Sequence, residues 1–361
     1  MIRQPVTLIA EAGVNHNGDL AQAFDLVDAA AEAGADLIKF QTFSAKAMVT
    51  KTAALAEYQK TQIGESKSQL EMLEELELDG SAHEALIQKC ADREIGFLST
   101  PFDLVSLNLL ISGLRQDLIK IGSGDLNNGP LLYAAAQAGC KIILSTGMAN
   151  LGEIERALGL LALGYSAAPP TTPSRADMAT AWSDPDLRTG LTDKVTILHC
   201  VSNYPASAQA TNLRAMQTIA TATGLPVGYS DHTLGGTASI AAATLGACCI
   251  EKHLTLDKTL PGPDHTASSE PDEIKAIFAA IRDVEIMLGS PVKTCTPEER
   301  STAKAARKGL VALTDIRKGS VISSDNLTTK RAGSGRDPMA YWEALGKTAT
   351  KDYSEGMPID D

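Results

Sequence analysis

Eight short apolar runs recur along the chain, and each one stops abruptly in small polar, acidic or histidine residues. A strand that is apolar at successive positions is typical of a parallel sheet, because helices cover both of its faces. Segments with helical periodicity alternate with these runs, so the pattern predicts an α/β fold, a (β/α)8 TIM barrel. The eight predicted strands are Thr7–Glu11, Leu37–Thr42, Phe97–Phe102, Ile119–Asp125, Ile142–Gly147, Val195–Ser202, Val227–His232 and Cys249–His253.

The segments between these strands carry the signals of amphipathic helices. After the first strand, Asp19 is a candidate N-cap, apolar residues follow at helical spacing, and Gly34 is a candidate stop. Asn150 and Glu153 have the spacing of a capping box. Further helices are predicted at about 69–92, 130–138, 151–163, 211–222, 235–246 and 271–288.

The same rhythm divides the chain into parts. Residues 1–290 are predicted to form the barrel, and residues 164–192 interrupt it with a Pro- and Thr-rich stretch. We interpret that stretch as a surface insertion with no packed core of its own, on the face away from the strand C-termini. Residues 291–305 have the composition of a linker, and residues 306–361 change to short β-like runs that indicate a small second domain. There, Lys330–Arg336 combine cations with a flexible loop, which on sequence alone suits a solvated turn.

The overall charge narrows the classes of partner. At −12, it argues against a general role on nucleic acid or on an anionic membrane. The six cysteines form no CxxC pair and several lie in apolar runs, so we expect reduced thiols and no disulfide framework. No apolar run is long enough for a membrane helix, and the apolar stretch near Leu8 is too short for a signal peptide. We therefore expect a soluble cytoplasmic protein.

Two histidines end neighbouring predicted strands. His232 closes the seventh strand and His253 the eighth, so both side chains are expected at the same mouth of the barrel. Two imidazoles with open coordination positions suit a divalent cation that polarises a carbonyl oxygen. The alternative is that each is a hydrogen-bonded structural histidine. The acids at the neighbouring strand ends favour the metal site.

Cations and hydroxyls also gather at the strand ends. Lys39 and Lys120 lie near the ends of the second and fourth strands. Together with a ring of short hydroxyl side chains, two ammonium groups suit a ligand that carries a phosphate, or a phosphate and a carboxylate. Taken singly, each serine has the alternative of an ordinary turn residue. The hydroxyls are those of Ser123, Ser145, Ser202 and Ser230.

Four acids lie at or just past strand ends. They are candidates for a general acid or base, or for an acceptor of a ligand hydroxyl. Exposed loop acids are common, so this signal is weak without the histidines and lysines. The four acids are Glu11, Asp125, Glu251 and Asp264.

Short motifs in consecutive order are similar to those of the sialic acid (N-acetylneuraminate) synthase family. The similarity spans nearly the whole chain apart from residues 164–192, and Lys330–Gly335 resembles the loop of that family's C-terminal antifreeze-like (SAF) domain. The number of motifs and their order argue against chance similarity. The barrel motifs are Ala10–Gly18, Ile38–Thr42, Ser99–Phe102, Lys120–Gly124, Leu144–Met148, His199–Cys200, Tyr204–Pro205, Ser230–Thr233, Glu251–His253 and Gly262–Asp264.

The resemblance implies a reaction. Phosphoenolpyruvate condenses with an N-acetylmannosamine-type sugar, with C–O cleavage, to give a nonulosonic acid and phosphate. His232 and His253 would hold Mn²⁺ or Mg²⁺, and Glu11 would be the acid or base near the reacting carbons. The residues implied to hold phosphoenolpyruvate are Lys39, Lys120, Ser123, Ser145, Ser202 and Ser230.

The resemblance also implies a sugar site completed by a second subunit. Family members resemble domain-swapped homodimers, so Arg331 of the partner subunit would reach the N-acetyl group of the sugar. The residues implied to line the sugar site are Gln41, Thr100, Phe102, Asp125, Tyr204 and Asp264.

Two departures from the family pattern concern the acceptor sugar. Asp125 stands where the family commonly has Glu, and Ala332 follows Arg331 where the family commonly has Pro. One alternative is therefore a synthase that uses a 2,4-diacetamido-trideoxy-mannose to make a legionaminic-type acid. Another is a sugar-binding protein without catalysis, against which the intact histidine pair argues.

Overall fold

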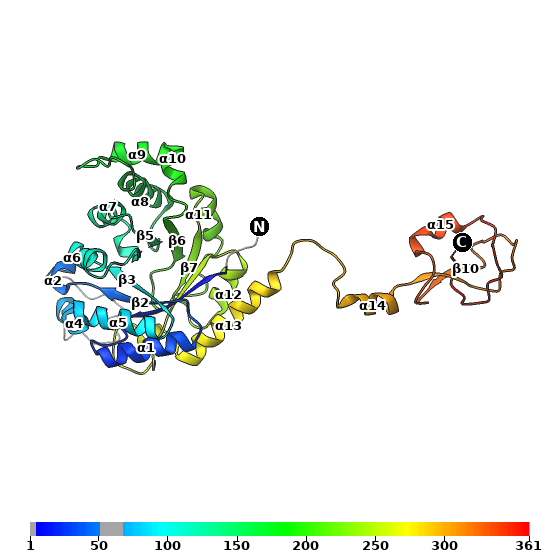
Figure 1. The fold of residues 1–361 in the computed structure, drawn as a ribbon, viewed down its shortest axis with the longest axis horizontal. Coiled ribbons are helices and arrows are strands. Elements are labelled where there is room, and N and C mark those ends of the chain that lie inside the picture. The colour runs from blue at the N-terminus through cyan, green and yellow to red at the C-terminus, as the bar shows by residue number, and fades with distance from the viewer. Residues whose placement is uncertain (1–4, 51–67, 361) are drawn as a thin grey trace. The chain divides into compact units, whose positions relative to one another are not determined.

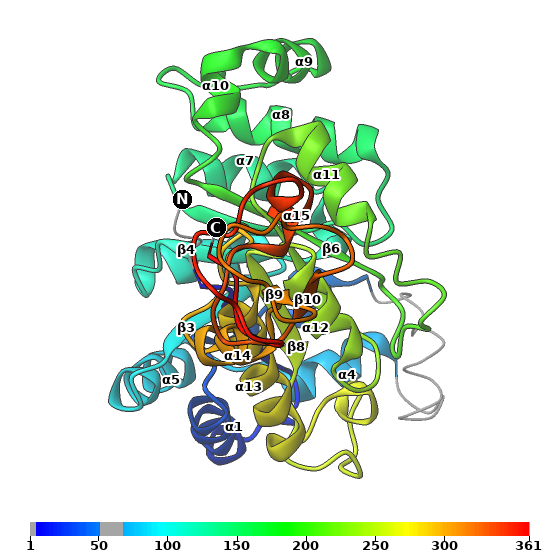
Figure 2. The same ribbon diagram turned by 90° about the vertical axis from the view of Figure 1, so that its right-hand side faces the viewer.

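The computed structural model describes residues 5–50 and 68–360, and the chain forms two compact units, Met1–Gly289 and Ser290–Asp361. In the first unit, parallel strands form a nearly closed barrel with helices around it (Figures 1 and 2). This confirms the predicted TIM-like fold. The strands are β1 Thr7–Gly13, β2 Leu37–Thr42, β3 Gly96–Pro101, β4 Leu118–Ile121, β5 Lys141–Ser145, β6 Val195–Cys200, β7 Val227–Asp231 and β8 Cys249–His253.

The strand order explains how distant segments meet. The hydrogen-bonded order is β3-β2-β1-β8-β7-β6-β5-β4, so β1 lies between β2 and β8, and β3 and β4 end the series. In this register Glu11 is opposite Lys39 on one side and His253 on the other. Three residues from the two ends of the barrel sequence are therefore neighbours at one mouth.

Two layers of apolar side chains hold the barrel together. Inside the barrel, side chains from alternate strand positions fill the space, so it is a packed core. Outside, the opposite faces of the strands pack against the helices. The buried residues of the inner layer are Ile9, Leu98, Ile143, Leu198 and Cys249.

The helices follow the strands along the chain. The helix predicted at about 69–92 is wrong as one element, because Glu77–Asp79 break it and the Asp79 side chain caps the second part by accepting from Ala82 N. The predicted capping box of Asn150 and Glu153 is confirmed. The helices of the barrel are α1 Leu20–Glu32, α2 Ala45–Met48, α4 Gln69–Leu76, α5 Gly80–Asp92, α6 Leu104–Asn108, α7 Gly129–Gln137, α8 Leu151–Gly164, α11 Ala215–Thr223, α12 Thr237–Thr244 and α13 Pro271–Leu288, with short turns at Leu109–Gly113, Ser123–Asp125 and His265–Ala267.

The insertion between α8 and β6 has more structure than the sequence suggested. It contains two helices, α9 Arg175–Ser183 and α10 Pro185–Thr189, and α9 packs along α8 (Figure 1). Gly159 of α8 permits this approach, because a side-chain carbon there would overlap the carbonyl group of Met178. The insertion thus packs on the barrel through α8, and its buried residues Ala181 and Leu191 belong to the barrel core.

The second unit has its own small core. It contains α14 Glu299–Ala306, β9 Gly309–Ala312, β10 Leu327–Lys330, a turn at Pro338–Ala340 and α15 Tyr341–Ala344. The two strands are antiparallel. Within residues 5–50 and 68–360, no helix has the length and apolar character that crossing a membrane requires. The buried apolar residues of this unit include Leu310, Ala312, Ile316, Ile322, Leu327, Ala344, Ala349, Tyr353 and Ile359.

Candidate active site

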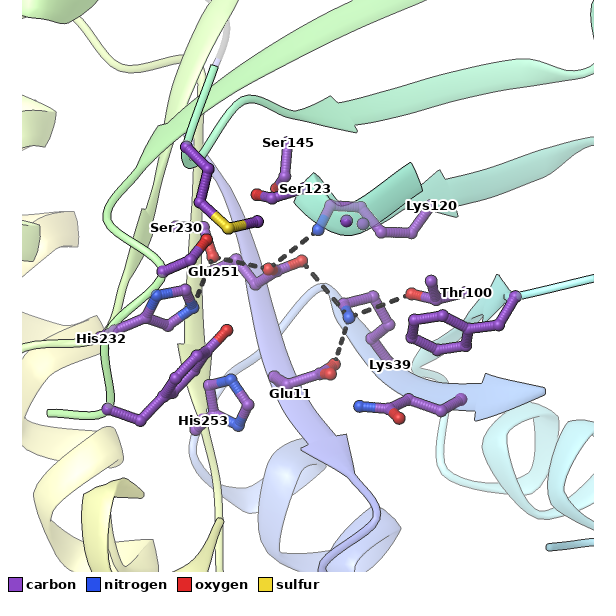
Figure 3. Close-up of a pocket in the computed structure, with 17 residues that line it drawn as sticks. Glu11, Lys39, Thr100, Lys120, Ser123, Ser145, Ser230, His232, Glu251 and His253 are labelled. Atoms are coloured by element: carbon purple, nitrogen blue, oxygen red, sulfur yellow. Dashed lines mark hydrogen bonds and ion pairs between the residues drawn. The ribbon is translucent and has the colours of Figure 1, made fainter. Parts of the chain in front are cut away.

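A cavity of about 350 Å³ opens where the barrel strands end, and most of the predicted site residues line it (Figure 3). They come from strands or strand ends on both sides of the barrel, which places the cavity at the catalytic face of this fold. The predicted residues that line it are Glu11, Lys39, Gln41, Thr100, Phe102, Lys120, Ser123, Ser145, Ser202, Tyr204, Ser230, His232 and His253.

Four buried charged side chains form the floor of the cavity. Lys39 Nζ lies 2.7 Å from Glu11 Oε2 and 3.8 Å from Glu251 Oε2. Lys120 Nζ lies 3.1 Å from Glu251 Oε1. Figure 3 shows Glu251 between the two ammonium groups, with Glu11 on the far side of Lys39. We call these four residues the charge cluster.

The two glutamates of the charge cluster have opposite protonation tendencies. Burial raises the pKa of Glu11 to about 7, and Glu251 adds to this rise, although Lys39 opposes it. Burial also disfavours the Glu251 carboxylate, yet Lys120, Lys39 and a 2.7 Å hydrogen bond from Ser230 Oγ hold its pKa well below the ordinary range. Glu251 is therefore a fixed anion, while Glu11 exchanges a proton near neutral pH.

The hydroxyl groups of Ser123, Ser145, Ser202 and Ser230 line the same cavity as Lys120, and we call them the serine arc. Ser123 Oγ accepts a 2.9 Å hydrogen bond from Gly147 N and lies 3.1 Å from Cys200 Sγ. Among the described residues, the buried Ser145 hydroxyl has no hydrogen-bond partner. A side-chain carbon on Gly147 would lie within 3.0 Å of the Ser123 and Ser202 hydroxyl oxygens, so only glycine lets them come this close.

The two histidines meet at one wall of the cavity. Their ring centroids are 5.5 Å apart, and the ring of Tyr204 lies 4.2 Å from that of His232. His232 Nδ1 donates a 2.7 Å hydrogen bond to Val201 O, which leaves the lone pair on Nε2. His253 Nδ1 is buried and has no hydrogen-bond partner within the described part of the chain.

These two nitrogens suit a divalent metal. Burial lowers the pKa of His232 and holds that of His253 well below its ordinary value, so both rings are neutral and able to ligate. Within residues 5–50 and 68–360, no group of three or more His, Cys, Asp or Glu side chains is arranged to hold a metal ion. Two histidine ligands would leave other coordination positions to substrate and water.

Three predicted site residues do not line the cavity. Asp125 is turned toward Asn128, whose side chain donates a 2.8 Å hydrogen bond to it. Asp264 lies just behind the wall, where a side-chain carbon on Gly13 would meet both Glu11 and Asp264. Arg331 belongs to the second unit.

The cavity also has lining residues that the site prediction lacked. The most consequential is Glu251, which the sequence marked only as one of several acids at strand ends. Strand alternation provides a signal for it, because Glu251 and His253 are two positions apart and face the same side of β8. The others are Gly122, Gly124 and Met148.

Comparison with known proteins identifies the family of this chain. The model of the NeuB family matches residues 26–293, and the SAF domain model matches residues 307–361. The chain belongs to the NeuB family. Its SAF match covers most of the second unit, Ser290–Asp361.

Several NeuB family relatives match over nearly their full length. The N,N'-diacetyllegionaminic acid synthase of Campylobacter jejuni is 46% identical over 348 residues, which cover 96% of this chain and 97% of the relative. The enzyme of the same name from Legionella pneumophila is 43% identical, with coverages of 98% and 92%. The crystal structure of N-acetylneuraminic acid synthetase from Leptospira borgpetersenii matches with a TM-score of 0.66 at 32% identity, covering 83% of this chain and 91% of that one. The expected family resemblance, and an N-acetylneuraminate synthase-like transferase as the class of enzyme, are confirmed.

The protonation of Asp264 gives a test of this NeuB family site. Burial raises the pKa of Asp264 to about 6, although Lys39 opposes the rise. An acid with a raised folded-state pKa destabilises the fold as pH rises from its unfolded pKa through its folded one. Asp264 should therefore lower the free energy of unfolding by about 2 kcal/mol between pH 4 and pH 7, with most of the loss between pH 4 and pH 6.

We expect Asp264→Asn to remove this loss, so that the gain in stability over the wild type is small at pH 4, grows between pH 4 and pH 6 and is nearly complete at pH 7. Urea unfolding of both proteins at pH 4, 5, 6 and 7 measures the difference. Asp19→Asn, at the exposed N-cap of α1, is the control. A gain that is the same at every pH would contradict the buried, titrating carboxyl.

Proposed function

We propose that this NeuB family member condenses phosphoenolpyruvate with a 2,4-diacetamido-trideoxy-mannose, releasing phosphate and a legionaminic-type acid. The observation that carries the proposal is the charge cluster, whose two buried ammonium groups line one cavity together with the serine arc. Relatives at 46% and 43% identity are legionaminic acid synthases, which favours this sugar over N-acetylmannosamine. Neither the charge cluster nor these relatives favour the alternative of a sugar-binding protein without catalysis.

Phosphoenolpyruvate fits the side of the cavity that contains the lysines. Lys39 and Lys120 are almost fully buried, so their attraction for a polyanion is weakly screened by water. The hydroxyl of Ser145, which has no partner among residues 5–50 and 68–360, and the hydroxyls of Ser123, Ser202 and Ser230 offer donors to phosphate oxygens. An anion would find this pocket already organised before it binds.

The condensation needs a group that moves protons near the reacting carbons. C3 of the enol phosphate bonds to the aldehyde carbon, water adds to the resulting cation at C2, and the C2–O bond to phosphate then breaks. The aldehyde oxygen gains one proton, the water loses one as it adds to C2, and the C2 hydroxyl gives its remaining proton to the departing phosphate. Because the pKa of Glu11 is about 7, this residue can donate the first proton and take up the second.

A divalent metal is the proposed cofactor. His232 Nε2 and His253 Nδ1 would hold Mn²⁺ or Mg²⁺, and the unpartnered, buried state of the second nitrogen supports this. When bound, the ion would supply Lewis-acid polarisation of the aldehyde oxygen. Glu11 is opposite His253 in the β1–β8 ladder, which supports a role for Glu11 in proton transfer close to that oxygen.

The sugar fits the remaining wall of the cavity. Gln41, Thr100, Phe102 and Tyr204 line it, and Asp264 and Asp125 lie behind or beside them. We assign the last contact to the partner subunit's Arg331 in a homodimer. The second unit exposes large apolar side chains suited to docking, with Met339 78% and Trp342 73% exposed.

The six cysteines are all free thiols, which fits the proposed location of this protein in the cytoplasm.

A panel of acceptor sugars tests the reaction. With phosphoenolpyruvate and Mn²⁺, we expect kcat/KM for the 2,4-diacetamido-trideoxy-mannose to exceed that for N-acetylmannosamine by about tenfold or more, as for a site built to hydrogen-bond the additional amide. Phosphate release gives the rate, and mass spectrometry identifies the product. Glu11→Gln, which keeps the shape of the side chain, is the control. Higher efficiency with N-acetylmannosamine would contradict the proposed sugar, and no product with either would contradict the reaction.

The serine arc gives a second test, on the phosphoenolpyruvate side alone. In Gly147→Ala the added methyl group displaces the Ser123 and Ser202 hydroxyls, so the affinity for phosphoenolpyruvate should fall about tenfold or more, equivalent to about 1.4 kcal/mol. Isothermal titration calorimetry without sugar measures it. Gly129→Ala, where the nearest atom is 3.6 Å from the added carbon, is the matched control. Unchanged affinity in a folded Gly147→Ala protein would place the phosphate elsewhere.

A further inference from the structure

A second buried ion pair lies directly behind the two histidines. Asp231 and Lys252 are opposite each other in the β7–β8 ladder, and each is only 1% exposed. Because side chains alternate along a strand, they face away from the cavity that His232, His253 and Glu251 line. The pair touches neither the cavity nor any residue assigned above to substrate.

The hydrogen bonds of this pair converge on the residue that follows His232. Asp231 Oδ1 accepts from Thr233 N at 2.8 Å and from Thr233 Oγ1 at 2.7 Å. Lys252 Nζ donates to Thr233 O at 2.6 Å and lies 3.2 Å from Asp231 Oδ2. Asp231 Oδ2 also accepts from Ser239 Oγ at 2.6 Å, which ties the pair to α12. Every polar atom of Thr233 is thus held from the outside of the barrel.

His232 is the residue enclosed by this arrangement. Its carbonyl oxygen accepts a 2.8 Å hydrogen bond from Ala206 N, and its neighbours on both sides belong to the Asp231–Lys252 network. Its ring then reaches Val201 O through Nδ1. A carbonyl only accepts, so this bond puts the proton on Nδ1 and leaves Nε2 as the lone-pair nitrogen. A shift of the turn at Thr233 would break that bond and release the ring.

The free-energy cost of burying two charges indicates that this ion pair does more than fill space in the core. Removing two charges from water costs several kcal/mol per ion, and apolar replacements of similar volume often give equal or greater stability. Buried ionic groups that persist are best attested as devices that fix one arrangement among several. Here the arrangement that they fix is the turn that presents His232.

We propose that Asp231 and Lys252 are positioning residues, which hold the His232 ring in the one tautomer and orientation that presents Nε2 to the cavity. The proposal rests on the proposed function, in which that nitrogen binds the metal. Partners that orient a ligating histidine typically affect metal affinity by about 10–100-fold when they are changed. The same scale is expected here.

The test uses the full-length double variant Asp231→Asn/Lys252→Met. Lys252→Met alone would leave the Asp231 charge buried and unpaired, whereas the double variant removes both charges and keeps an oxygen that accepts from Thr233. Thr233→Val is a milder second variant, because it removes only the Thr233 Oγ1 donor. Lys89→Met, which breaks a Lys–Asp pair between α5 and α1, is the matched control.

Two readouts separate positioning from folding. In metal-free protein labelled with ¹⁵N-histidine, nitrogen chemical shifts report the His232 tautomer, and calorimetry reports the Kd for Mn²⁺ alone. We expect the double variant to unfold within a few degrees of the wild type, to populate both His232 tautomers and to bind Mn²⁺ about 10–100-fold more weakly. Thr233→Val should show a smaller change in the same direction, and Lys89→Met none.

A wild-type tautomer pattern in both the double variant and Thr233→Val would overturn the proposal. If the wild-type protein itself binds no Mn²⁺, the metal assigned under the proposed function is wrong, but the tautomer measurement still decides the positioning role. If the double variant does not fold, Thr233→Val decides it alone. Failure of the inference and failure of the proposed function therefore give different results.

Discussion

The attraction between two buried lysines and two buried glutamates is the interaction on which the site depends. Four charged groups in a barrel interior would be costly without one another, and their mutual contacts at 2.7–3.8 Å offset that cost. The β-ladder sets these contacts, since Glu11 is opposite Lys39 and beside the strand of Glu251. The fold thus holds paired charges at the mouth of the barrel. There an anionic ligand can take the place of the glutamates as the partner of the lysines.

Within this cluster, two residues of the same type take different roles because their surroundings differ. Glu251 has two ammonium groups and the Ser230 hydroxyl around it, so it stays ionised and holds both lysines in place. Glu11 forms its ion pair with Lys39, and burial, with a smaller contribution from Glu251, raises its pKa to about 7. Two carboxyl groups with separated pKa values are a common sign of divided acid–base roles. Here one anchors the lysines, and the other has the pKa that the proposed proton transfer requires.

Much of this arrangement could be predicted from the sequence. Parallel barrel strands are recognisable as apolar runs, and their C-terminal ends lie at the same end of the barrel. That rule placed His232, His253, Lys39 and Lys120 together without any coordinates. It could not show that Asp125 turns to Asn128, since the direction of a side chain after a strand end depends on the local turn. The rule also did not distinguish Glu251 from the other acids at strand ends. That distinction requires knowing which face of β8 points into the barrel.

Proton uptake on binding is the most direct measure of the central claim, that the charge cluster is the phosphoenolpyruvate site. At pH 8 Glu11 is mostly ionised in the free protein, and a polyanion placed beside it would raise its pKa further and draw in a proton. Titration calorimetry of phosphoenolpyruvate in buffers with different ionisation enthalpies counts the protons taken up. We expect an uptake approaching one proton in the wild type and its loss in Glu11→Gln. Equal uptake in both proteins, or none in the wild type, would contradict it.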